Sequence, residues 1–310
     1  MLYVTCYMLF NLVIILMLLN PLGNVYFADK PFFDIAKNEN APIPERINPE
    51  NIGVKVTARR FVAIDVHSGK LLLQKDSQVK QPIASITKIM TALVILDRQP
   101  NWQKIVVMSA KDETFGAQPN IYRGEEVRFI DLWKAALVSS DNNSIMAMVR
   151  SLGFDQKSFV ELMNKKAEEL QMFNSSFSDP TGLSEYNVST ALDLSRLVYA
   201  AMQKNEIKES VLQGKYDLVI ANNKKKRYLM NTDILLDSFL NKKKYGYELI
   251  GGKTGFTNEA GYCLAVEISK EDNPVVVVVL DSDTIEARFQ DVKAIADWVY
   301  TNYRWDRRDK

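Results

Sequence analysis

Ser85 and Lys88 are the two residues whose types and spacing first suggest chemistry. They stand three positions apart in segment 82–88, just before a long apolar run. Residues three apart on a helix lie on one face, so the hydroxyl and the amine can come within hydrogen-bonding distance. A serine nucleophile needs a partner that accepts its proton, and apolar surroundings lower the pKa of a lysine. The pair can therefore be a nucleophile and its base, but Ser-x-x-Lys alone is a weak signal and is more often a helix-cap serine followed by a solvent-directed lysine.

The helix that would position this pair follows at once. Apolar residues occupy almost every side of the helix predicted over 89–96, a pattern typical of a buried helix. Its N-terminal end also favours negative charge developing at Ser85.

Composition limits the partners. A chain of 310 residues with 47% hydrophobic content can form one large domain or two small ones. The net charge of +1 argues against a nucleic-acid partner, because no basic excess is available to bind phosphates. The lysine-rich runs 224–227 and 242–244 are interpreted as solvated loop tips.

Metal and histidine chemistry are not expected. The single histidine, His67, lies in the turn predicted at 65–70, a poor place for a general base. Cys6, His67 and Cys263 give no ligand cluster and no disulfide framework. We therefore predict no metal and no cofactor, and lysine is the better base for a hydrolase.

The N-terminal region indicates export. Residues 1–28 carry no charged side chain and are nearly continuously apolar from 3 to 19. They are a signal peptide or an N-terminal membrane anchor, and we favour an uncleaved anchor because segment 26–28 is a poor cleavage site. Residues 29–55 combine charges with four prolines, which predicts an extended spacer between the membrane and the domain.

The remaining chain predicts an α/β (α+β) domain over 56–304. Strands are expected near 58–66, 70–74, 247–255, 261–269 and 274–280, and helices near 129–138, 145–152, 159–170, 191–202 and 285–299. The five consecutive valines at 275–279 suit a strand covered on both faces. We therefore expect a mainly antiparallel sheet built from both chain ends, flanked by helices, with an all-helical subdomain at about 97–205.

Two further motifs strengthen the prediction that Ser85 is a nucleophile. The sequence Ser140-Asp141-Asn142 lies in a polar turn between predicted helices, and Lys253-Thr254-Gly255 lies on a late predicted strand. Together with Ser85 and Lys88, and in this order, they resemble the penicillin-binding proteins and serine β-lactamases.

The flanking sequence resembles one family in particular. Segments 82–91, 179–183, 252–257 and 260–262 resemble the D-alanyl-D-alanine carboxypeptidase family of low-molecular-mass penicillin-binding proteins. The resemblance runs from about 59 to 298 and does not extend to the C-terminal β domain that many members carry. It implies a β-lactamase/transpeptidase-like fold.

The resemblance implies a role for each matched residue. Ser85 would attack the carbonyl of the penultimate D-alanine and form an acyl-enzyme, with Lys88 taking its proton. Ser140 would pass a proton to the leaving amine, and Asn142 would hydrogen-bond Lys88 and the substrate amide. Lys253 would add positive potential beside the serine and help to orient Ser140.

The same resemblance assigns the substrate-binding residues. Thr254 would hydrogen-bond the terminal carboxylate, and Gly255 would leave room for a peptide along the strand edge. The backbone N–H groups of Ser85 and Phe256 would form the oxyanion hole, where one donor is typically worth about 3 kcal/mol. Phe256 stands where many relatives have histidine, which removes a polar side chain near the carboxylate. Arg288 either approaches this pocket or is an ordinary surface arginine at a helix start.

The function predicted from these residues is a serine-type D-Ala-D-Ala carboxypeptidase acting outside the cytoplasm on peptidoglycan stem peptides and inhibited by β-lactams. A DD-endopeptidase that cuts cross-links is the first alternative. A β-lactamase is another, but Glu161 and Glu185, the nearest candidates to position a deacylating water, lack the usual spacing. A non-catalytic wall-binding or sensor protein on the same scaffold is the last.

Overall fold

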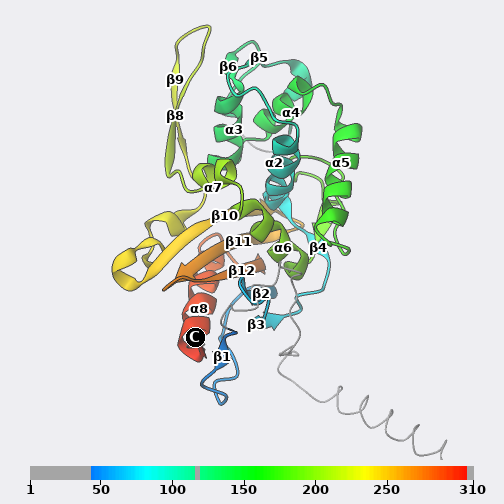
Figure 1. Cartoon of the computed structure of the whole chain (residues 1–310). Helices are drawn as coiled ribbons and strands as arrows, with labels where there is room; N and C mark the ends of the chain where they lie inside the picture. Colours follow the sequence, from blue (N-terminus) through cyan, green and yellow to red (C-terminus); the bar gives the residue numbers. More distant parts are fainter. Residues whose placement is uncertain (1–42, 116–118, 306–310) are drawn as a thin grey trace, which may run out of the picture.

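The computed structural model describes residues 43–115 and 119–305, and a five-stranded antiparallel sheet lies at its centre (Figure 1). Its strand order is β10-β11-β12-β2-β3, so the first strands of the domain pair with the last. The strands are β2 (Arg60–Asp65), β3 (Leu71–Lys75), β10 (Tyr247–Thr257), β11 (Gly261–Lys270) and β12 (Asn273–Ser282). The predicted sheet from both chain ends is confirmed.

The valine run forms the middle of the sheet. All five residues of Val275–Val279 on β12 are completely buried. Val276 and Val278 join the core shared with the helical region, while the other three join the core on the opposite face. The prediction that this strand is covered on both faces is confirmed, because successive strand side chains point to opposite faces.

One helix covers each face of the sheet. The C-terminal helix α8 (Ala287–Asn302) buries Phe289, Val292 and Ile295 against one face. Helix α6 (Ala191–Met202) contacts β2, β11 and β12 on the other face. The apolar periodicity of the sequence predicts the bounds of α6 correctly. That α6 packs against the sheet is visible only in the tertiary structure.

The other helices stack beyond α6, at the top of Figure 1. They are α2 (Thr87–Asp97), α3 (Phe129–Val138), α4 (Asn142–Ser151), α5 (Gln156–Glu169) and α7 (Asn205–Val211). Helix α2 buries nine consecutive residues from Thr87 to Ile95, so the predicted buried helix is confirmed. Ser85 itself lies in the short 3₁₀ turn η1 (Ala84–Ile86) that leads into α2.

The helical region also contains strands. The two-stranded ribbon of β5 (Ile105–Val107) and β6 (Glu126–Arg128) lies within the stretch expected to be all-helical. Its strands have three residues each, too short for a clear alternating pattern. A second hairpin, β8 (Lys215–Val219) and β9 (Lys226–Met230), projects beside α3 (Figure 1). Strand β9 begins with two residues, Lys226 and Arg227, of the run predicted as a solvated loop tip, so that part of the prediction is wrong.

Residues 43–55 belong to the stretch predicted as a spacer, and they pack against the C-terminal helix. Strand β1 (Glu45–Arg46) pairs with β13 (Tyr303–Arg304), and the indole N–H of Trp298 donates to Asn51 Oδ1 at 2.9 Å. The predictions for residues 1–28 and 29–42 lie outside the described residues. Within 43–115 and 119–305, no helix combines the length and apolar character needed to cross a membrane.

Candidate active site

Ser85 and Lys88 meet at the start of α2 as their spacing predicts. Lys88 Nζ lies 2.9 Å from Ser85 Oγ. The Lys88 side chain is completely buried, whereas Ser85 lines an open cavity. The serine is therefore accessible to a substrate while its partner is sealed beneath it. The alternative of a solvent-directed lysine is wrong.

Lys88 has two further partners, which fix its amine in place. Its Nζ donates to Asn142 Oδ1 at 2.6 Å and to the Thr181 carbonyl at 2.7 Å. Burial lowers the Lys88 pKa from 10.5 to about 7, although the carboxylates of Asp179 and Asp141 oppose this change. A neutral amine has a lone pair that can accept the Ser85 proton. The site therefore holds a base that is substantially neutral near pH 7.

The Thr181 carbonyl reaches Lys88 because of a tightly bonded loop. Asp179 Oδ1 accepts from the backbone N–H groups of Thr181 at 2.6 Å and Gly182 at 2.9 Å. Gly182 has φ of +89°, and a Cβ there would lie 2.1 Å from the Ala84 carbonyl oxygen. Only glycine fits this close approach. The sequence motif Asp-Pro-Thr-Gly marked the loop, but not the role of the Thr181 carbonyl.

Ser140 and Asn142 lie where α3 gives way to α4. Ser140 adopts φ of +63°, a left-handed conformation that is uncommon for a residue with a Cβ. Asp141 then caps α4, since its side chain accepts from Ser144 N at 2.7 Å. Asn142 is the first residue of α4, and both Ser140 and Asn142 line the same cavity as Ser85. The turn thus brings both predicted residues to the site.

Gly255 lies on β10, the edge strand of the sheet that contacts the Ser85 turn. A Cβ on Gly255 would lie 2.9 Å from the Ile83 carbonyl oxygen and 3.2 Å from Ser85 N. Glycine is therefore needed for the strand to approach the nucleophile segment, a reason different from the predicted space for a peptide. The same close approach places the backbone of Gly255, the residue before Phe256, beside Ser85.

Lys253 is nearly completely buried beneath the cavity. Its Nζ donates to the Thr254 carbonyl at 3.2 Å and to Thr232 Oγ1 at 3.5 Å. No hydrogen bond among the described residues joins Lys253 to Ser140, so the predicted orienting contact is not seen. Burial, followed by the charges of Lys88 and Arg288, places the Lys253 pKa well below its ordinary value.

Two residues near Lys253, Thr232 and Asp233, were not predicted from the sequence. The hydroxyls of Thr232 and Thr254 are 2.6 Å apart, and both residues line the cavity. Asp233 is buried, accepts from Leu235 N at 2.9 Å, and has its pKa raised to about 6 by burial. No motif marks Thr232 or Asp233 in the sequence, and only the fold brings them beside Lys253.

Arg288 and Phe256 define the far side of the cavity. Arg288 is 5% exposed, and its Nη1 donates to the Gly255 carbonyl at 3.1 Å. Of the two alternatives for Arg288, proximity to the pocket is therefore confirmed. The Phe256 ring is about half exposed and stacks on Tyr262 with centroids 4.3 Å apart.

The cavity has a volume of about 510 Å³. It brings together seven of the nine predicted site residues, while Lys88 and Lys253 lie buried next to it; the seven are Ser85, Ser140, Asn142, Thr254, Gly255, Phe256 and Arg288. Glu161 and Glu185 are not among its lining residues. No cluster of potential metal ligands occurs among the residues that the structure describes. The arrangement offers a nucleophile, a buried base and a cationic side chain, Arg288, around one open cleft.

Comparison with known proteins agrees with this geometry. A family model described as D-alanyl-D-alanine carboxypeptidase matches residues 45–284. The chain is 33% identical over 239 residues to a D-alanyl-D-alanine endopeptidase of Pseudomonas aeruginosa, covering 76% of this chain and 75% of the relative. It is 32% identical over 273 residues to a D-alanyl-D-alanine endopeptidase of Escherichia coli K12, covering 87% and 84%.

The chain is also similar to a carboxypeptidase and to a solved transpeptidase structure. The D-alanyl-D-alanine carboxypeptidase DacF of Bacillus subtilis is 33% identical over 258 residues, which cover 79% of this chain and 63% of the relative. The solved structure of the Streptomyces K15 DD-transpeptidase superposes with a TM-score of 0.73 at 25% identity, covering 80% of this chain and 98% of that chain. The predicted β-lactamase/transpeptidase-like fold is confirmed.

Proposed function

Because the chain belongs to the D-alanyl-D-alanine carboxypeptidase family and is a serine peptidase, we propose that it removes the terminal D-alanine from peptidoglycan stem peptides. The observation that carries this proposal is the 2.9 Å contact between Ser85 Oγ and the buried Lys88 amine. The low pKa of Lys88 gives it the neutral form that a general base requires near pH 7.

In the proposed acylation step, Ser85 Oγ attacks the carbonyl carbon of the penultimate D-alanine while Lys88 accepts the hydroxyl proton. The carbonyl oxygen gains negative charge, which the backbone N–H groups of Ser85 and Phe256 stabilise. The peptide C–N bond then breaks, and the leaving nitrogen receives a proton through Ser140. Water later adds to the ester and restores the free serine.

Two residues of the cavity lining support recognition of the terminal carboxylate. Arg288 brings positive charge to the cavity wall, and the Thr254 hydroxyl can donate to a carboxylate oxygen. Phe256 supplies an apolar surface in place of a polar side chain. Asn142 would hold the substrate amide while it keeps Lys88 in place.

We further propose that the protein acts outside the cytoplasm, where peptidoglycan is located, and that residues 1–28 export or anchor it. Determination of the N-terminal sequence of the protein isolated from a membrane fraction tests this point. An intact first residue supports an anchor, and a new N-terminus near residue 29 supports a cleaved signal peptide.

A DD-endopeptidase that cuts cross-links is the second candidate, favoured by the two endopeptidase relatives that match three quarters or more of their own lengths. The two activities differ in the group that leaves. Purified protein is therefore incubated with a monomeric pentapeptide and with a cross-linked dimer. Release of D-alanine from the monomer supports the carboxypeptidase, and conversion of the dimer alone supports the endopeptidase.

The Ser85→Ala variant tests the chemistry itself. We expect fluorescent penicillin to label the wild-type protein stably and Ser85→Ala not at all, because a β-lactam acylates the same hydroxyl. Label that is lost within seconds would instead indicate a β-lactamase. Full biological activity of Ser85→Ala would indicate a non-catalytic wall-binding or sensor protein.

A further inference from the structure

One arginine of the β8–β9 hairpin, Arg227, contacts the loop at 120–125, and this loop in turn bonds the active-site turn. Its two faces differ: Lys226, Tyr228 and Met230 on β9 are exposed, whereas Leu229 is buried. Arg227, on the same strand face as Leu229, points inward and is 22% exposed. The sequence placed Arg227 in a solvated lysine-rich run, but its side chain has specific partners.

Arg227 holds the loop that precedes β6. Its guanidinium makes a bidentate ion pair with Glu125, with both N–O distances at 2.5 Å. Its Nη1 also donates to the Asn120 carbonyl at 2.8 Å. Glu125 is 10% exposed and accepts from Tyr122 N at 2.8 Å, while the guanidinium lies 4.8 Å from the centre of the Tyr122 ring. Such planar bidentate pairs fix orientation as well as position.

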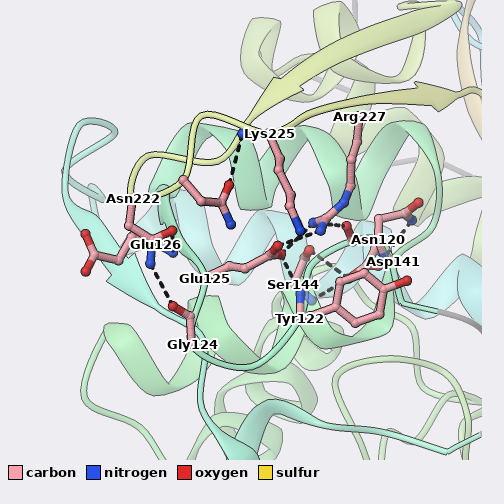
Figure 2. Close-up of polar contacts among 11 residues, drawn as sticks. Asn120, Tyr122, Gly124, Glu125, Glu126, Asp141, Ser144, Asn222, Lys225 and Arg227 are labelled. Carbon is pink, nitrogen blue, oxygen red and sulfur yellow. Dashed lines mark hydrogen bonds and ion pairs between the residues drawn. The ribbon is translucent and has the colours of Figure 1, made fainter.

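The same loop holds the turn that carries Ser140 and Asn142. Asn120 N donates to Asp141 Oδ2 at 2.6 Å, and its side-chain amide donates to Ser139 Oγ at 3.0 Å. Asp141 Oδ1 accepts from Ser144, so the two oxygens of one carboxylate connect the loop to α4. Figure 2 shows this arrangement, which runs from Arg227 through Glu125 and Asn120 to Asp141.

Asp141 stands between two of the proposed catalytic residues. Ser140 before it has the left-handed backbone described above, and Asn142 after it bonds Lys88. A left-handed residue with a Cβ persists only where its surroundings hold it. The contacts of Asn120 with Ser139 and Asp141 supply such a constraint from outside the turn.

We propose that Arg227 is a positioning residue for this active site: by holding Glu125 and the Asn120 carbonyl, it fixes the loop that keeps Ser140 and Asn142 in their reactive positions. This inference rests on the proposed peptidase function. Arg227 is not among the residues that line the cavity, and it acts only through Asn120 and Asp141.

The test compares Arg227→Ala with Lys226→Ala. The two residues are neighbours on β9, and each substitution removes one positive charge. Lys226 lies on the exposed face, whereas Arg227 points inward. Active sites are first counted by complete labelling with fluorescent penicillin, and kcat for D-alanine release from a short pentapeptide is expressed per labelled site. We expect Arg227→Ala to lower kcat about tenfold, because a misplacement of 1 Å can cost about 100-fold in rate. Lys226→Ala should keep the wild-type kcat.

Two variants with smaller changes extend the test. Arg227→Lys keeps the charge but loses the bidentate geometry, and we expect an intermediate kcat. Glu125→Gln removes the carboxylate at the other end of the pair, and its effect should not add to that of Arg227→Ala, since the two residues act as one unit. If Arg227→Ala does not fold, these comparisons are made with Arg227→Lys.

Several results would overturn the inference. A variant with a lower melting temperature but a wild-type kcat per labelled site would show that Arg227 only stabilises the fold. An equal loss in Lys226→Ala would indicate a general charge effect, and additive losses would separate Glu125 from Arg227. Failure of the proposed function is distinguishable, because the wild type and Lys226→Ala would then both leave the pentapeptide intact.

Discussion

The rate of Ser85 acylation should depend on pH through the protonation of Lys88. Burial brings the Lys88 pKa to about 7, and only the neutral amine can accept the serine proton. The neutral fraction is then about a tenth at pH 6 and about nine tenths at pH 8. With the ordinary lysine value of 10.5, only about three molecules in a thousand would be neutral at pH 8. Acylation should therefore rise about tenfold between pH 6 and pH 8 and then level off.

The assay is the second-order rate constant for labelling by a fluorescent penicillin, measured from pH 5 to pH 10. Asp233 is another group that titrates in this range, with a pKa of about 6. Asp233→Asn removes its titration and should leave the inflection near pH 7 in place. A rate that is flat between pH 6 and pH 8, or that keeps rising to pH 10, would refute the argument that burial prepares Lys88 as the base.

Three other changes test how the fold supports the site. Gly182→Ala should destabilise the protein by about 3 kcal/mol or more and abolish penicillin labelling, because the new Cβ would overlap the Ala84 carbonyl; normal labelling would contradict the close packing of this loop. Asp291→Asn should lower the free energy of unfolding by about 2 kcal/mol, since its buried carboxylate accepts four hydrogen bonds that join residues 57–58 and Ser282 to α8. Labelling per folded molecule should not change in that variant, and urea unfolding monitored by fluorescence measures the difference. Phe256→Ala should keep the acylation rate within about threefold, because the proposed oxyanion donor there is the backbone N–H; a 100-fold loss would show that the ring itself is required.

The parts of the fold that follow from local pattern could be predicted. The apolar periodicity of Phe129–Val138 and Ala191–Met202 gave the bounds of α3 and α6, and the valine run gave the central strand. The short ribbon β5–β6 could not be found, because three-residue strands carry too little periodic signal. The packing of residues 43–55 on α8 was also missed, since it depends on side-chain partners distant in sequence such as Trp298.

The site was predictable where it rests on motifs and not where it rests on contacts between loops. Ser85, Lys88 and Asn142 were identified from spacing and order, and the structure joins them by hydrogen bonds. The Thr181 carbonyl could not be identified in this way, because a backbone acceptor leaves no mark on residue type. Arg227 was assigned to solvent, since a lysine-rich run does not indicate which cation turns inward.

The site buries two lysine amines, and this has a cost that the surrounding fold must offset. The change in the Lys88 pKa from 10.5 to about 7 corresponds to roughly 5 kcal/mol of lost stability below pH 7. Because the unfolded chain binds the proton more tightly, this loss diminishes as the pH rises from about 7 to 10.5. Lys253 is buried close enough for the two charges to oppose each other. The surrounding fold therefore does more than place the reacting groups. The hydrogen bonds to Lys88, together with the Asp179 loop and the buried sheet, also stabilise a structure in which Lys88 is neutral at a pH where the unfolded chain would keep it charged.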